Sequence, residues 1–238
     1  MSYLGFLEDT SNAIEASDLD GDGLTDIVIG IHRPQFPDMN SKRLFILLNH
    51  GDGRSYSIYE MPHKAIFNVE SIVIGDFNND GKANDIGACS YKSIVSTFST
   101  IQYDNHPYAG YKKVDNRIFG KPQSIIRGRF NDDKFDDLAL VSPQTDTLHV
   151  LLAYGDGNRT FTQQIYHSPH NPVSVAAINF NNDPIDDLAV LSCNQTIRMY
   201  LGTKNGIFHE NDISFYVGEN STNECYRSLR SADLNQDG

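Results

Sequence analysis

The stretch Asp18-Leu-Asp-Gly-Asp-Gly-Leu-Thr-Asp26 decides how the rest of the chain is interpreted, because variants of it recur four more times. The other copies are Asp76-Phe-Asn-Asn-Asp-Gly-Lys-Ala-Asn-Asp85, Arg129-Phe-Asn-Asp-Asp-Lys-Phe-Asp-Asp137, Asn179-Phe-Asn-Asn-Asp-Pro-Ile-Asp-Asp187 and Asp233-Leu-Asn-Gln-Asp-Gly238. We call them loops one to five. Their first residues lie 58, 53, 50 and 54 residues apart. This period indicates one supersecondary unit stacked several times, since a single copy cannot bury its apolar face alone.

Short runs rich in β-branched residues flank the loops, such as Ile27-Val-Ile29 after loop one and Ile72-Val-Ile74 before loop two. Such runs predict strands, and a third strand with a Gly-rich turn follows in three repeats. The unit is therefore four antiparallel strands, which predicts an all-β chain of β-propeller blades. The predicted repeats cover residues 12–66, 67–118, 119–169 and 170–225, with the first strand of a fifth within 226–238.

Two details of this organisation are separate predictions. Loop five stops at Gly238 in mid-motif, so we expect the chain to be part of a longer array, a partial propeller. In the second repeat the third strand and its turn are indistinct between Ser90 and Val114. The stretch Tyr103-Asp-Asn-His-Pro-Tyr108 there predicts an enlarged loop.

The composition excludes some classes of function. A formal net charge of −12 argues against nucleic acid as a partner. No apolar run approaches the roughly 20 residues of a membrane helix, so no membrane insertion is expected within this chain. The N-terminus shows no signal peptide. Three cysteines show no metal-ligand spacing, so buried, reduced thiols are the default prediction for Cys89, Cys193 and Cys225.

Loop one has the ligand chemistry of a calcium site. Calcium takes six to eight oxygen ligands from carboxylates, amides, backbone carbonyls and water. Side chains of Asp18, Asp20, Asp22 and Asp26 and the Leu24 carbonyl offer such oxygens, and two glycines permit a tight turn. An EF-hand is excluded, since it requires flanking helices and a glutamate at its twelfth position.

The other loops depart from this pattern by degrees. Loop two offers Asp76, Asn78, Asp80 and the Lys82 carbonyl, and an extra residue leaves either Asn84 or Asp85 as its last ligand. Arg129 replaces the first ligand of loop three, so we predict an empty site with Arg129 paired to Asp133 or Asp137. Loop four is a weaker candidate and loop five is truncated; their ligands are Asn179, Asn181, Asp183, Asp187, Asp233, Asn235 and Asp237.

At this point the chain resembles the FG-GAP/VCBS repeat family, which includes the integrin α-subunit head. The resemblance covers nearly the whole chain and rests on Gly75–Lys82, Asp137–Val141, Asp187–Val190, Leu151–Phe161 and Tyr200–Phe208. It implies a seven-bladed propeller with calcium in the first hairpin of some blades, of which this chain would supply four and the start of a fifth. Arg129 and Pro184 depart from the family pattern.

The function expected from these features is a calcium-stabilised binding or adhesion module in an extracellular or cell-surface setting. Its partner would be a protein or a glycan. The alternatives are a carbohydrate-binding lectin, because the chain has 12 Tyr and 13 Phe, and a non-catalytic accessory domain of a secreted enzyme. We expect no enzymatic activity, because the sequence has no nucleophile elbow, zinc pair or phosphate loop.

Overall fold

The protein is described by a computed structural model that covers residues 10–32, 44–61, 68–90, 92–103, 106–155, 160–217, 225 and 228–232. Sixteen strands in this part of the chain form four antiparallel sheets, each built from four consecutive strands. We call the sheets blades one to four. Each strand pairs with the next along the chain, as in a meander. The prediction of an all-β chain of four-stranded blades is confirmed.

Blade one consists of β1 (Thr10–Ser17), β2 (Asp26–His32), β3 (Leu44–Asn49) and β4 (Tyr56–Glu60). Blade two consists of β5 (Val69–Gly75), β6 (Asp85–Ser90), β7 (Ile94–Tyr103) and β8 (His106–Arg117). Blade three consists of β9 (Ser124–Gly128), β10 (Asp137–Ser142), β11 (Thr147–Ala153) and β12 (Phe161–His167), with a 3-10 turn at Pro143–Thr145. Blade four consists of β13 (Pro172–Ile178), β14 (Asp187–Ser192), β15 (Thr196–Leu201) and β16 (His209–Tyr216).

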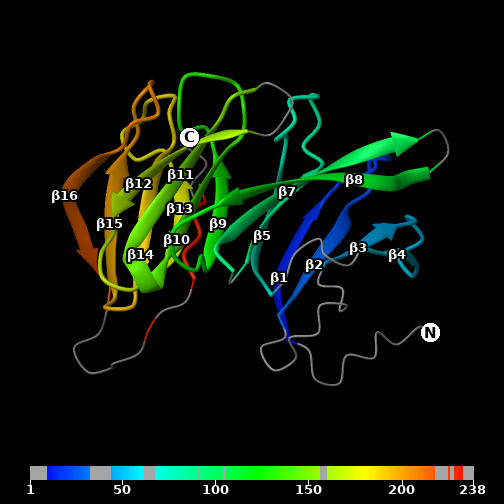
Figure 1. Ribbon diagram of the computed structural model, residues 1–238, viewed down its shortest axis with the longest axis horizontal. Helices are drawn as coiled ribbons and strands as arrows, with labels where there is room; N and C mark the ends of the chain where they lie inside the picture. Colours follow the sequence, from blue (N-terminus) through cyan, green and yellow to red (C-terminus); the bar gives the residue numbers. More distant parts are fainter. Residues whose placement is uncertain are drawn as a thin grey trace.

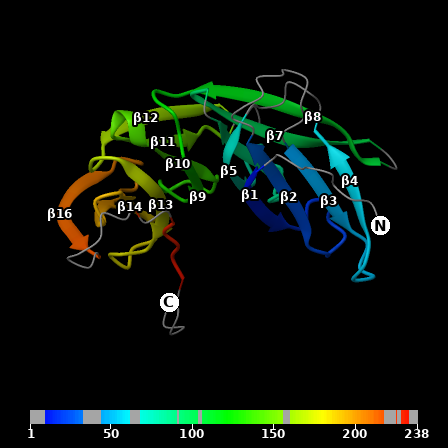
Figure 2. The ribbon, with the colours of Figure 1, turned by 90° about the horizontal axis from the view of Figure 1, so that it is seen from below.

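The four blades fan out in an arc (Figures 1 and 2). Their first strands lie side by side on the inner side of the arc, with β5 between β1 and β9, and β9 between β5 and β13. The fourth strands lie on the outer side, as Figure 2 shows. Residues 228–232 continue this order, because Leu229 N–H donates to Ser174 Oγ (3.0 Å) and Ser231 Oγ donates to the Ala177 carbonyl (2.6 Å). This segment lies where the first strand of a fifth blade was predicted, although it is not paired as a strand.

The apolar core is divided among the junctions between neighbouring blades. Val28, Ile46 and Phe98 belong to the cluster between blades one and two. Separate clusters fill the second and third junctions, around Leu138 and Val190 respectively. Backbones approach closely there: a Cβ on Gly30 would meet Val69 Cγ1 at 2.5 Å. Each sheet thus buries its apolar face against the next blade, as the repeat pattern predicts.

The prediction of an enlarged loop at Tyr103–Tyr108 is wrong. Strands β7 and β8 are the longest strands among the described residues. They pair as far as Tyr103 and His106, which leaves only residues 104–105 between the two strands. The run Ile94-Val-Ser-Thr-Phe98 is rich in β-branched and aromatic residues, which favour a strand even without the Gly-rich turn seen in the other repeats.

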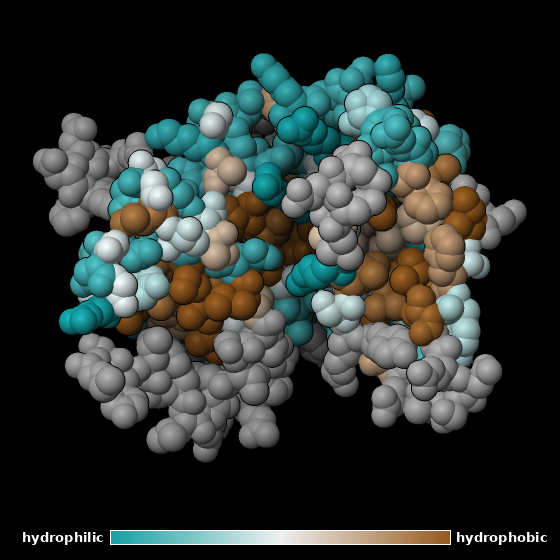
Figure 3. Space-filling model, turned by 180° about the vertical axis from the view of Figure 1, so that it is seen from behind, coloured by the Kyte–Doolittle hydropathy of each residue, from teal (hydrophilic) through white to brown (hydrophobic). Residues whose placement is uncertain are grey.

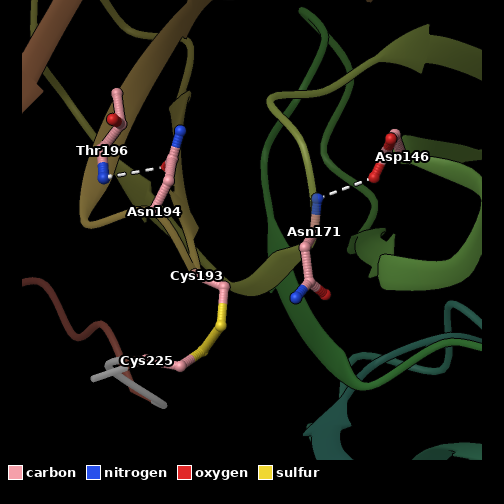
Figure 4. The surroundings of a disulfide bond; sticks show 6 residues. All are labelled: Asp146, Asn171, Cys193, Asn194, Thr196 and Cys225. Atoms are coloured by element: carbon pink, nitrogen blue, oxygen red, sulfur yellow. Dashed lines mark hydrogen bonds between the residues drawn. A yellow bond between two sulfur atoms is a disulfide. The ribbon is translucent and has the colours of Figure 1, made fainter. Parts of the chain in front are cut away.

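The prediction for the cysteines is only partly correct. Cys89 is a free, buried thiol, and burial raises its pKa. Cys193 and Cys225 instead form a disulfide (Figure 4). Their separation of 32 residues in sequence gave no local signal for this pairing.

Candidate metal centre

Loop one connects β1 to β2 in a tight turn held by its own side chains. Gly21 and Gly23 have φ angles of +82° and +85°, a region in which other residues are strained. The two carboxylate oxygens of Asp18 accept the N–H groups of these glycines at 2.7 and 2.9 Å. Asp20 and Asp22 each accept the N–H two residues later. These Asx turns fold the loop around its own acidic side chains.

The carboxylates of Asp18, Asp20 and Asp22 converge, with one oxygen of each within 4.8 Å of the others. Desolvation raises the pKa of Asp20, the hydrogen bond from the Asp22 N–H opposes this, and the nearby charges of Asp26, Asp22 and Asp18 raise it further. No cationic side chain appears among the interactions of these three residues within the described chain. In the described chain, backbone N–H groups alone offset the negative charge of these three carboxylates. A divalent cation would neutralise it.

The donor set fits calcium. Three carboxylates supply oxygens only, and each oxygen that accepts one backbone N–H keeps a further lone pair. Asp18, Asp20 and Asp22 would hold the ion, which would supply the charge that keeps the loop compact. The predicted contribution of the Leu24 carbonyl stays a prediction.

Asp26, the remaining predicted ligand of loop one, has a second task. It is fully buried. Its Oδ2 accepts the Leu19 N–H at 2.9 Å, and its Oδ1 accepts the Asn49 N–H at 2.8 Å. One side chain thus ties the beginning of the loop, the start of β2 and the end of β3 together.

The Oδ2 contact of this clamp recurs in every blade, and its Oδ1 contact at the end of the third strand recurs in blades three and four. We call Asp26, Asp85, Asp137 and Asp187 the closing aspartates. All four are fully buried. Their Oδ2 atoms accept the N–H of Leu19, Phe77, Phe130 and Phe180 at 2.9–3.0 Å. Burial raises the pKa of Asp137 to about 7, although N–H donation from Ala153 and Phe130 opposes this. The signal for this role was available in the sequence: each of these residues directly precedes a buried apolar strand.

In loop two the structure assigns the closing role to Asp85 rather than Asn84. The Asn84 amide turns towards blade one and donates to the Leu19 carbonyl at 3.5 Å. Asp76 accepts the N–H groups of Asp80 and Gly81, as Asp18 accepts those of its own loop. The Lys82 carbonyl, a predicted ligand, accepts the Asn84 N–H at 2.9 Å.

An asparagine distinguishes loops two, three and four from loop one. Asn78, Asn131 and Asn181 occupy the position of Asp20, and each accepts a backbone N–H through Oδ1. Their Nδ2 atoms therefore face the next carboxylate and donate to Asp80, Asp133 and Asp183 at 3.1, 2.7 and 2.7 Å respectively. An amide N–H supplies there part of the positive charge that a cation would bring to loop one.

The predicted pairing of Arg129 is wrong. No ion pair joins its guanidinium to Asp133 or Asp137 among the described residues. Asp137 is occupied by backbone N–H groups, and Asp133 by Asn131 and the Phe135 N–H. The backbone of Arg129 instead exchanges two hydrogen bonds with Asp186 of blade four.

This contact belongs to a series that links neighbouring loops, which we call the inter-blade clasps. Asp136 of blade three accepts the Asp76 N–H of blade two at 2.8 Å and pairs with Arg127 at 3.1 Å. Asp186 of blade four accepts the Arg129 N–H of blade three at 2.8 Å. In loops two, three and four, the residue just before the closing aspartate thus forms a hydrogen bond with the preceding blade. The sequence analysis did not predict this role for Asp136 and Asp186.

Two sets of predicted ligands remain as predictions. In loop four the Asn181 amide donates a hydrogen bond to Asp183, and Asp187 acts as the closing aspartate. The Asn179 side chain forms no hydrogen bond with the described residues. Asp233, Asn235 and Asp237 lie outside the described residues.

Comparison with known proteins supports the family resemblance. Residues 18–84 match the family described as FG-GAP-like repeat. No curated protein gives a significant match to the chain. The matched segment runs from the first residue of loop one to the residue before the closing aspartate of loop two, and so contains the carboxylate cluster. Residues 18–84 therefore contain an FG-GAP-like repeat, and the four four-stranded antiparallel sheets are consistent with blades of that family.

Proposed function

We propose that the chain is a calcium-stabilised, non-catalytic β-propeller module that binds or adheres to a protein or glycan partner outside the cell. The observation that carries this proposal is the convergence of Asp18, Asp20 and Asp22 within an FG-GAP-like repeat. Calcium has a structural role in it: the ion holds the hairpin between β1 and β2, and the arc of blades presents its loops to the partner.

One observation and one general expectation support an extracellular or cell-surface setting. The Cys193–Cys225 disulfide is of a kind that persists in oxidising compartments. Extracellular calcium modules work at dissociation constants of about 10⁻⁴–10⁻³ M, which suit a loop with three converging carboxylates. Among the described residues, no helix has the length and hydropathy needed to cross a bilayer.

The calcium site is tested by thermal and urea unfolding of the full chain in calcium and in chelator. At about 10 mM calcium, a site with the dissociation constant above should add roughly 1.4–2.7 kcal/mol to the free energy of unfolding. The double variant Asp20→Ala/Asp22→Ala should lose most of this increment.

The matched control is Asn131→Ala/Asp133→Ala, which removes the same two positions from loop three. It should lower stability equally in calcium and in chelator, because the Asn131 amide already satisfies Asp133. Identical unfolding of the native chain in both buffers would remove the calcium site from the proposal.

A carbohydrate partner is the second candidate. Phe119 and Tyr154 are 64 and 63% exposed, and exposed aromatic rings can stack on sugars. Glycan-array binding by the calcium-loaded chain would support a lectin. Calcium-dependent attachment of the chain to cells stripped of surface glycans would instead support a protein partner.

A further inference from the structure

The turn between β14 and β15 carries an acceptor sequence that the metal site does not explain. Asn194-Gln-Thr196 is an Asn-x-Thr sequon, the signature of N-glycosylation in secreted proteins. Sequons in the sequence also begin at Asn158 and Asn220, but both of these residues lie outside the described part of the structure. Only the Asn194 sequon can therefore be judged by its geometry.

This turn presents the Asn194 side chain to solvent. The Gln195 N–H donates to the Ser192 carbonyl at 3.0 Å, which places Cys193 and Asn194 at the centre of a β-turn. Gln195 is buried and its side chain accepts from the Tyr216 hydroxyl, so the middle residue of the sequon anchors the turn inwards. Asn194 itself is exposed.

The conformation of the side chain suits a modifying enzyme. Asn194 Oδ1 accepts the Thr196 N–H at 3.2 Å, as Figure 4 shows. This Asx turn leaves Nδ2 as the outward atom of the amide. No described residue accepts a hydrogen bond from Nδ2.

The disulfide supports an oxidising compartment, the setting in which glycan transfer occurs. Cys193 precedes Asn194 directly, and its bond to Cys225 fixes this turn to the connection that follows blade four (Figure 4). In blade three the equivalent turn is held without a covalent bond: Asp146 accepts the Asn171 N–H at 2.7 Å and pairs with His170. An oxidised cysteine and an Asn-x-Thr acceptor in one turn both point to the secretory pathway.

We propose that Asn194 is an N-glycosylation site, an inference that rests on the extracellular setting proposed above. The donor class is a lipid-pyrophosphate-linked oligosaccharide. The bond from the anomeric carbon to the pyrophosphate oxygen breaks, a bond from that carbon to Nδ2 forms, and an Nδ2 proton passes to a base of the transferase.

The position of the site determines what the glycan covers. Loops one to four connect first to second strands, whereas Asn194 lies between second and third strands, at the opposite end of the blade. The glycan therefore shields the disulfide end of blade four and leaves the face with the acidic loops open.

The test uses the full chain behind a secretory leader in cultured animal cells. The peptide with Asn194 is analysed by mass spectrometry after enzymatic glycan release in heavy-oxygen water, from both the medium and the internal membranes. We expect the heavy-oxygen aspartate label at Asn194. Asn194→Gln and Thr196→Ala should abolish it, whereas Thr196→Ser should retain it.

The outcomes separate this inference from the proposed function. A chain with the Cys193–Cys225 bond formed but Asn194 bare, in medium and membranes alike, overturns the glycosylation site and leaves the extracellular setting intact. A glycosylated chain with both cysteines reduced supports the site but removes the disulfide argument for that setting. Comparison of Thr196→Ser with Thr196→Ala, which both keep Asn194, controls for misfolding of the Asn194→Gln variant.

Discussion

At the scale of single residues, one heteroatom distinguishes the converging carboxylates of loop one from the loops in which an asparagine amide donates to the next carboxylate. Asp20 can only accept hydrogen bonds, whereas Asn78 donates to Asp80 from the same position in loop two. We therefore predict that Asp20→Asn raises the melting temperature in chelator and reduces the gain produced by calcium. The measurement is a thermal melt in both buffers. Lower stability of the variant in chelator would contradict the role assigned to the amide.

A buried histidine makes a second prediction at this scale. His149 is fully buried on β11, with Nδ1 2.9 Å from Gln163 Nε2 and Nε2 2.9 Å from Thr147 Oγ1. Because the Gln163 amide donates to Nδ1, Nε2 carries the proton and the ring is neutral. Burial lowers its pKa from 6.5 to about 4, although a hydrogen bond with the Phe119 backbone opposes this.

Between these two pKa values the unfolded chain binds a proton that the folded chain does not. The His149 contribution to the free energy of unfolding therefore falls as pH falls from about 6.5 towards 4, by about 2 kcal/mol at about pH 5. Because the pKa of Asp137 is raised, its contribution to the free energy of unfolding grows as pH falls, opposite to that of His149. The test therefore compares the pH dependence of a variant with that of the native chain. The free energy of unfolding of His149→Gln, measured with urea, should fall less between neutral pH and pH 5 than that of the native chain. The exposed-site control His209→Gln should follow the native chain.

These residues also show what the sequence could and could not predict. Strands, blades and the carboxylate cluster follow from local patterns, since apolar runs and Asx-rich turns act within a few residues of one another. The partners of Asp186 and Cys193 lie 57 and 32 residues away. Contacts of that range depend on how blades pack, and an Asp-Asp pair in sequence is the same whether its members bind an ion or a backbone.

At the scale of the structural element, the closing aspartates stabilise the blade with or without an ion. Asp187 accepts three N–H groups, from Phe180, Asn181 and Gly202. In Asp187→Asn an NH₂ group would replace one of the two acceptor oxygens and face the N–H groups that now donate to it. We therefore expect a loss of about 1–3 kcal/mol in the free energy of unfolding.

The loss at Asp187 should be the same in calcium and in chelator when measured by urea unfolding. Glu210→Gln, an exposed change in the same blade, should stay within about 0.5 kcal/mol of the native chain. A loss that appears only in calcium would instead identify Asp187 as a ligand, as the sequence predicted.

At the scale of the whole molecule, stability depends on junctions rather than on a single core. Three apolar clusters lie between neighbouring blades, and the inter-blade clasps close two of these junctions on the side of the acidic loops. The Asp136 clasp bonds to the backbone of Asp76, a predicted ligand. This hydrogen bond joins loop two to loop three through one carboxylate.

The clasp between blades three and four makes the last prediction. Asp186→Ala removes the acceptor of the Arg129 N–H while leaving the closing Asp187 in place. We expect a loss of about 1–2 kcal/mol in stability and faster hydrogen exchange at Arg129 and Phe130. Asp132→Ala, an exposed aspartate of loop three, is the control. If exchange rises equally in both variants, the effect is one of lost surface charge. If it rises only in Asp186→Ala, the Asp186 carboxylate adds to the two backbone hydrogen bonds, Asp186 N–H to Arg129 and Asp132 N–H to Lys204, that already join blades three and four.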